Sequence, residues 1–127
     1  SYAPYSKFNV AAVAKTSSGQ FVTGTNQENA SFPAGICAER TLLSAVSSLY
    51  PADSVTTIAI SYHNNNTGGQ SDRPVSPCGI CRQSLLEFEN RTKQKIRLIL
   101  SGMNGKVMVI DSASMHLPFS FGSDDLK

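Results

Sequence analysis

The three cysteines of this chain stand in two short motifs. Cys78 and Cys81 lie three positions apart in the segment SPCGICRQ, and Cys37 lies in the segment GICAER. Residues three apart in the first turn of a helix face the same side, so Cys78 and Cys81 could place both sulfur atoms on one metal ion, and Cys37 could supply a third. A zinc ion with only three protein ligands keeps one position for water, which distinguishes a catalytic zinc site from a structural one.

Two other interpretations of the cysteines stay open at this point. A C-x-x-C pair could be a redox-active dithiol, in which case Cys37 would be a small buried apolar side chain. A structural site of three cysteines would need a fourth zinc ligand from His63 or His116. Neither histidine has the spacing typical of a zinc ligand.

Glu39 follows Cys37 by two residues. On its own, a glutamate in the first turn of a helix needs no functional explanation, because it interacts favourably with the helix dipole. Beside three zinc-binding cysteines, the same carboxylate could act as the general acid and base for a hydrolytic reaction.

The segments that carry these residues alternate between strand-like and helix-like patterns. Apolar residues recur every three or four positions after Cys37 and after Ser76, which predicts two amphipathic helices, the second capped by Ser76 with Pro77 in its first turn. Strands are predicted over residues 7–15, 20–25, 56–63, 95–100 and 106–111, with a loop-like tail over 116–127. The order β-β-α-β-α-β-β predicts an α/β protein with a mixed sheet covered by helices.

Both cysteine motifs therefore fall at predicted helix starts. The unpaired N–H groups and the partial positive charge at a helix N-terminus lower the pKa of a nearby thiol. Two helix starts that face one ion would thus favour the thiolate form that zinc requires.

The length and composition of the chain predict a single folded domain over residues 1–127. A chain of 127 residues can bury a core without disulfide bonds, and no apolar run approaches the roughly 20 residues that cross a bilayer. The net charge of +2 comes from scattered basic residues, which gives no support to nucleic-acid binding. An odd number of cysteines and no visible secretory signal favour a reducing compartment, so we expect a cytoplasmic protein.

Five motifs of the chain, in the same order, resemble those of one enzyme family. They are SYAPYSKFNV, NQENASFP, CAER, SPCGICRQ and PFSFGSDDL, and they span almost the whole chain. With them the chain resembles the small homotetrameric, zinc-dependent cytidine deaminases, which share a P-C-x-x-C run and a catalytic glutamate with other zinc deaminases. The resemblance implies a three-layer α/β/α fold with a mixed sheet of about five strands. The implied reaction is hydrolytic deamination of cytidine and deoxycytidine to uridine and deoxyuridine plus ammonia, in pyrimidine salvage.

The resemblance also assigns roles to residues of the metal site. It implies that Cys37, Cys78 and Cys81 bind one zinc ion per chain and that Glu39 transfers the protons of the reaction. Three thiolates on a zinc dication leave a net negative charge, and the guanidinium of Arg40 is expected to offset it through hydrogen bonds to cysteine sulfurs.

A second group of residues is implied to bind the nucleoside. Asn26 and Glu28 are expected to hold the ribose 3′-hydroxyl, and Phe8 to pack beside the pyrimidine. Backbone groups of Ala38 and Ser76 are expected to bind the edge of the base. Without the resemblance, Asn26 and Glu28 would be interpreted as turn residues and Phe8 as a core aromatic residue.

Phe121, in the tail, resembles the aromatic residue that this family inserts into the pocket of a neighbouring subunit, which implies a homotetramer. The chain departs from the family pattern at Ala11–Val13, where Gly-Ala-Ala is common, and at Phe32, where tyrosine is common. The family's N-terminal helix, which normally precedes SYAPYS, is missing from the given sequence, because it was removed, is disordered or was lost.

Other functions compete with this one. A related deaminase could act on an aminonucleoside antibiotic or on a base in nucleic acid, although the latter needs a basic and aromatic path for a single strand, which this sequence lacks. A structural zinc module without activity would leave Glu39 beside the thiols unexplained.

Overall fold

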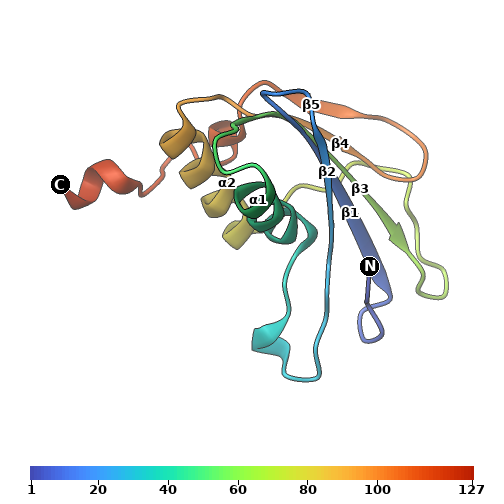
Figure 1. Cartoon of the computed structure of the whole chain (residues 1–127). Coiled ribbons are helices and arrows are strands. Elements are labelled where there is room, and N and C mark those ends of the chain that lie inside the picture. Colours follow the sequence, from blue (N-terminus) through green and yellow to red (C-terminus); the bar gives the residue numbers. More distant parts are fainter.

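A mixed sheet of five strands forms the centre of the structure, a computed structural model that describes residues 1–127 (Figure 1). Its strands lie in the order β2-β1-β3-β4-β5, with β3 and β4 parallel and the other neighbouring pairs antiparallel. The elements are β1 (Phe8–Thr16), β2 (Phe21–Thr25), α1 (Ala38–Leu49), β3 (Val55–Asn64), α2 (Gly79–Thr92), β4 (Arg97–Ser101) and β5 (Met108–Ile110). The predicted order of strands and helices is confirmed.

Two details of the predicted elements were wrong. Helix α2 begins at Gly79 with Cys78 as its N-cap, and not with Ser76 as the cap, because the backbone of Cys78 is still extended (φ −68°, ψ 169°). The tail over residues 116–127, predicted as a loop, contains the short 3-10 helix η3 (Ser123–Leu126), and another one, η2 (Ala113–His116), leads into it. Single turns of this kind are too short to produce an apolar periodicity in the sequence.

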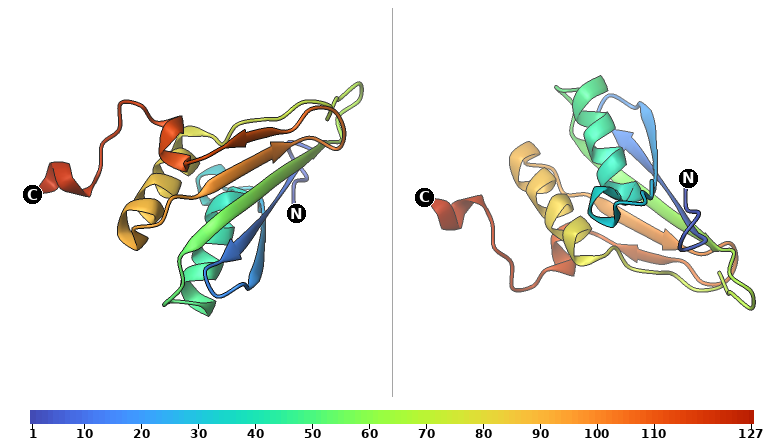
Figure 2. Two further views of the ribbon diagram at one scale, coloured as in Figure 1. Left: turned by 90° about the horizontal axis from the view of Figure 1, so that it is seen from above. Right: turned by 90° about the horizontal axis from the view of Figure 1, so that it is seen from below.

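Both helices pack against the same face of the sheet (Figure 2). Successive residues of a strand point to opposite faces, so along β1 Ala12 and Ala14 are buried whereas Val13 between them is exposed. The buried strand residues form one apolar cluster with helix residues such as Leu42 of α1 and Leu85 of α2. This cluster holds the two helices side by side on one face of the sheet, with α1 packed on β2 and β1.

The opposite face of the sheet carries no helix, and Phe21 is 70% exposed there. The architecture agrees with the predicted three-layer α/β/α fold, to which these residues contribute the sheet and one helical layer. No helix of the structure combines the length and the apolar character needed to cross a membrane.

Gly24 of β2 lets helix α1 approach the sheet closely. A Cβ atom at this position would lie 2.5 Å from the backbone nitrogen of Leu42 and 2.6 Å from the carbonyl oxygen of Ala38. Only glycine leaves room for this contact, which sets the position of the first turn of α1 relative to the sheet. Glu39 lies in that turn, directly after Cys37 and Ala38.

Candidate active site

The three cysteines meet where the N-termini of α1 and α2 approach each other. Cys37 is the N-cap of α1, Cys78 is the N-cap of α2, and Cys81 lies in the first turn of α2. Their three Sγ atoms all lie within 4.8 Å of one another, and those of Cys37 and Cys78 are 3.8 Å apart. Sulfur atoms that bind one zinc ion tetrahedrally at about 2.3 Å lie about 3.8 Å from each other. The thiols therefore fit a zinc ion.

The protonation of the thiols depends on their surroundings. Burial raises the pKa of Cys81, and the negative charge of Glu39 raises it further. Burial also raises the pKa of Cys37. Burial opposes ionisation of Cys78 as well, but hydrogen bonds from the backbone N–H and the thiol of Cys81 outweigh it and lower the pKa of Cys78. A cluster of this kind becomes fully ionised only with a cation among the sulfurs, which is the condition that zinc provides.

Glu39, the residue predicted to carry protons, lies beside the cysteines. Its side chain is 6% exposed, and its Oε2 atom accepts a hydrogen bond of 3.6 Å from the thiol of Cys81. The carboxylate thus lies beside the sulfur cluster and also lines the adjacent cavity.

A cavity of about 460 Å³ opens next to the thiols, which is large enough for a nucleoside-sized ligand. Most of its lining is apolar, with Phe8, Val10, Ile60, Tyr62 and Val75 among the wall residues. The residues predicted to form the site that line this cavity are Phe8, Asn26, Cys37, Ala38, Glu39, Ser76 and Cys78.

Tyr62 is a wall residue that the sequence analysis missed. Its ring stacks on that of Phe8, with centroids 4.8 Å apart and an angle of 14° between the planes, and its hydroxyl donates a hydrogen bond to the carbonyl of Arg73. The signal was present, since Tyr62 continues the alternation of Ile58 and Ile60 along β3 and therefore points to the same face.

Both the oxygen and the nitrogen of the Asn26 side-chain amide form hydrogen bonds within the chain. Its Oδ1 accepts hydrogen bonds from the backbone N–H of Val10 and from the hydroxyl of Ser1, and its Nδ2 donates to the carbonyl of Phe8. Asn26 therefore lines the cavity and also fixes the start of β1, on which Phe8 lies.

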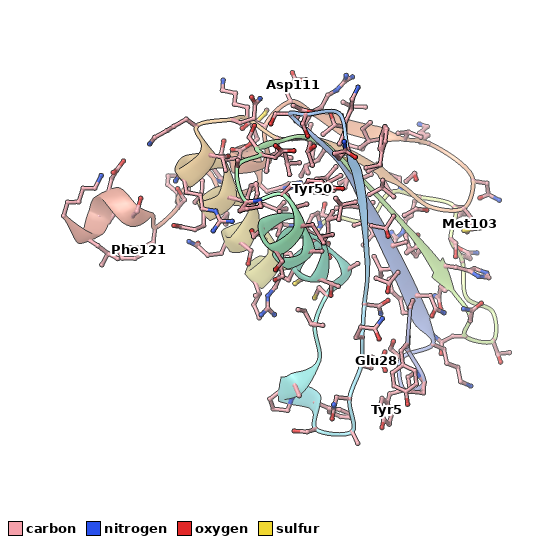
Figure 3. The ribbon with its side chains drawn as sticks, viewed as in Figure 1. Tyr5, Glu28, Tyr50, Met103, Asp111 and Phe121 are labelled. Atoms are coloured by element: carbon pink, nitrogen blue, oxygen red, sulfur yellow. The ribbon has the colours of Figure 1, made fainter.

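Glu28 lies outside the main cavity, in an adjoining hollow of about 270 Å³ that shares Ser6 with it. Its carboxylate accepts hydrogen bonds from the hydroxyl of Ser6 and from the backbone N–H groups of Tyr5 and Ser6. The bond from the Ser6 hydroxyl is the main reason that the pKa of Glu28 is lowered. Figure 3 shows Glu28 close to Tyr5 at the end of the molecule below α1.

Two residues predicted to act at the site, Arg40 and Phe121, do not line this cavity. Arg40 lines a groove of about 660 Å³ between α1 and α2 and makes no hydrogen bond to a cysteine sulfur. Phe121 is 59% exposed on the tail that projects beyond α2 (Figure 3). Its carbonyl accepts a hydrogen bond of 2.9 Å from Gln83 of α2.

Neither histidine belongs to the sulfur cluster, so the geometry gives no support to a structural site of three cysteines and one histidine. His63 is exposed on β3, and His116 lies in η2 with both ring nitrogens buried and without a hydrogen-bond partner. The presence of Cys37 within the cluster also disfavours a simple redox pair, which would need only Cys78 and Cys81.

A comparison of the sequence with known protein families agrees with this geometry of three thiols and a buried glutamate. Residues 1–96 match the family described as "Cytidine and deoxycytidylate deaminase zinc-binding region". The chain belongs to this family. The match covers the strands, helices and cysteines of the site, so the zinc cofactor predicted from the sequence is confirmed at the level of the family, with one cluster that could hold one ion.

Individual relatives of this deaminase family extend over nearly the whole chain. A cytidine deaminase of Halalkalibacterium halodurans is 32% identical over 99% of this chain and 86% of its own length. One from Sporosarcina psychrophila is 35% identical over 99% of this chain and 84% of its own length. The crystal structure of cytidine deaminase from Burkholderia pseudomallei superposes with a TM-score of 0.77 at 37% identity, over 94% of this chain and 87% of that one. The predicted fold class is thereby confirmed.

Proposed function

We propose that this chain is a zinc-dependent cytidine deaminase that converts cytidine and deoxycytidine to uridine and deoxyuridine with release of ammonia. The observation that carries the proposal is the position of Glu39, which is buried beside three converging thiols and faces a cavity of about 460 Å³. Membership of the deaminase family and relatives named cytidine deaminase support it.

The chemistry is divided between the metal and the protein. A zinc ion held by Cys37, Cys78 and Cys81 would supply the Lewis acidity that makes water a nucleophile at neutral pH. Glu39 takes a proton from the attacking water, donates one to ring N3 of the cytosine, and carries another to the amino group at C4. The oxygen of water forms a bond to C4, the bond from C4 to the amine breaks, and uridine and ammonia result.

The remaining cavity residues hold the nucleoside in this proposal. Phe8 packs beside the pyrimidine, backbone groups of Ala38 and Ser76 bind the edge of the base, and Asn26 reaches the ribose 3′-hydroxyl. Glu28 binds the same hydroxyl from the adjoining hollow, because Ser6 lines both that hollow and the main cavity. Arg40, one residue after Glu39 on α1, offsets the negative charge of the three thiolates.

The proposed enzyme is a homotetramer in which Phe121 enters the cavity of a neighbouring subunit, and the exposed C-terminal tail supports an interface between subunits. Phe119, Phe121 and Leu126 are 97%, 59% and 77% exposed, which is unusual for apolar side chains unless a partner covers them. Residues 1–127 would form one catalytic domain of a cytoplasmic enzyme of pyrimidine salvage.

The direct test is an ultraviolet assay of the purified, zinc-loaded protein with cytidine, deoxycytidine, cytosine and cytidine monophosphate. We expect turnover of both nucleosides and little of the free base, because Asn26 and Glu28 would bind the sugar. Loss of turnover after zinc removal, and its return with zinc, should accompany this activity. Zinc binding without turnover of any of the four compounds would contradict the proposal and favour a related substrate or a structural zinc module.

A further inference from the structure

Glu89 is a buried carboxylate that the proposed chemistry does not use. It lies in the last turn of α2, is 6% exposed, and forms no ion pair with a cationic side chain. A carboxylate near a helix C-terminus is unfavourable with respect to the helix dipole, and burial of a charge costs free energy unless hydrogen bonds offset it. The stability of α2 therefore does not explain this residue.

Hydrogen bonds from two other segments surround the Glu89 carboxylate. Its Oε2 accepts from the backbone N–H of Ile96 at 2.6 Å and of Ala113 at 2.9 Å. Its Oε1 accepts from the backbone N–H of Ser114 at 3.1 Å, and the hydroxyl of Ser112 lies 3.0 Å from both oxygens. Glu89 thus joins the end of α2 to the entry of β4 and to the start of η2.

The tail continues from this point toward the zinc-site end of α2. Arg82 donates a hydrogen bond of 3.4 Å to the carbonyl of His116, and Gln83 donates one of 2.9 Å to the carbonyl of Phe121. Arg82 and Gln83 directly follow Cys81 in the chain. The tail is therefore attached along α2, with Glu89 at the far end and the first turns of the helix at the other.

We infer that Glu89 is a positioning residue, which anchors the C-terminal tail on α2 and thereby sets where Phe121 is presented to the neighbouring subunit. The functional half of this inference rests on the proposed role of Phe121, whereas the anchoring half rests only on the contacts of Glu89. The position requires a carboxylate, because an ionised carboxylate accepts hydrogen bonds at both oxygens. A glutamine in either orientation would direct its NH₂ group at the backbone N–H of Ser114 or at those of Ile96 and Ala113.

The experiment compares zinc-loaded Glu89→Gln with Asp111→Asn, an exposed carboxylate that takes part in none of the side-chain hydrogen bonds. Ser112→Ala, which removes one donor to Glu89, serves as a milder variant should Glu89→Gln fold poorly. Hydrogen exchange of peptides from residues 112–127 reports the anchoring, and kcat and KM for cytidine report its effect on the site. Both measurements are repeated in chains that also carry Phe121→Ala.

We expect tail amides to exchange at least about tenfold faster in Glu89→Gln, less so in Ser112→Ala, and unchanged in Asp111→Asn. The kcat/KM for cytidine should fall about five- to tenfold, mainly through KM, with zinc content unchanged. In the Phe121→Ala background the same change should cost less than about twofold, because both substitutions act through one side chain.

Two results would overturn the inference. Unchanged tail exchange in both Glu89→Gln and Ser112→Ala would show that Glu89 does not anchor the tail. Equal losses of kcat/KM with and without Phe121 would show that Glu89 affects the site independently of Phe121. Should Phe121→Ala itself leave kcat/KM unchanged, the proposed role of Phe121 fails together with the functional half, and hydrogen exchange still decides the anchoring.

Discussion

The carboxylate of Glu39 faces two environments, since one of its oxygens accepts a hydrogen bond from Cys81 and the side chain also borders the cavity. A proton carrier needs this arrangement, because it must contact both the water and the base in turn. An isosteric amide would keep these contacts but could not accept and release a proton.

Glu39→Gln is therefore expected to keep its fold and its zinc and to lose about 10²- to 10⁴-fold in kcat. Metal analysis, circular dichroism and the cytidine assay measure the three properties, with Asp111→Asn as the control substitution. Activity within about twofold of the unmodified chain would remove Glu39 from the mechanism.

The raised pKa values of Cys81 and Cys37 predict how the zinc-free protein responds to pH. A raised folded-state pKa means that the folded chain holds the proton more tightly than the unfolded chain. This contribution to stability is complete below the unfolded pKa, near the ordinary value of 9.0, and is lost as the pH rises through the folded value. The lowered pKa of Cys78 changes the stability in the opposite direction, but it is a single thiol, whereas the pKa is raised for both Cys37 and Cys81.

We thus expect the melting temperature of the zinc-free protein to fall as the pH rises above about 9, with a smaller change in the zinc-loaded protein, whose thiolates are already ionised. Thermal unfolding between about pH 7 and about pH 10, with and without a chelator, measures this difference. A zinc-free melting temperature that does not change over this range would contradict the pKa shifts described for the thiols.

At the scale of elements, α1 delivers Cys37 and Glu39, and its distance from the sheet is set by Gly24. The Cβ of an alanine at this position would meet backbone atoms of α1, which cannot rotate away as a side chain could. The helix would have to move, and Glu39 would move with it.

Gly24→Ala is expected to lower the free energy of unfolding by about 1–3 kcal/mol or more, and to lower kcat at the same time. Urea unfolding measures the first effect and the cytidine assay the second. Gly79→Ala is the matched control, because a Cβ at Gly79 would have no atom within 4 Å, and we expect little change in its stability. Equal stability of the two variants would mean that α1 is free to shift.

The sequence predicted the elements that carry long periodic patterns and the residues that chemistry makes conspicuous. The β1–β2 hairpin and both helices follow from apolar spacing, whereas the choice of Cys37, Cys78 and Cys81 as one cluster came from the resemblance to the deaminase family. Contacts between distant segments could not be predicted in this way. The approach of Gly24 to α1 and the carboxylate of Glu89 beneath η2 depend on tertiary packing, which leaves no local pattern.

At the scale of the whole molecule, one face of the sheet and the C-terminal tail present apolar side chains to solvent. The tail projects from the body of the chain beyond α2 (Figure 1), and Phe119 and Phe121 have no aromatic partner within the chain. Within a single chain Phe121 does not line the cavity, and its side chain is exposed. Exchange of the tail between subunits would cover Phe121 and complete the cavity.

Mixed oligomers test this exchange, because Glu39→Gln and Phe121→Ala damage different chains of one shared site. If each site combines Glu39 of one chain with Phe121 of its neighbour, some sites in an oligomer assembled from both variants carry both native residues. Phe121→Ala removes packing against the base and not the chemistry, so its defect should appear mainly in kcat/KM, by about 1–3 kcal/mol. We expect the two variants, denatured and refolded together, to exceed the average of the separately refolded parents at low cytidine. Activity equal to that average, in oligomers that native mass spectrometry shows to be mixed, would mean that Phe121 serves its own chain or no site at all.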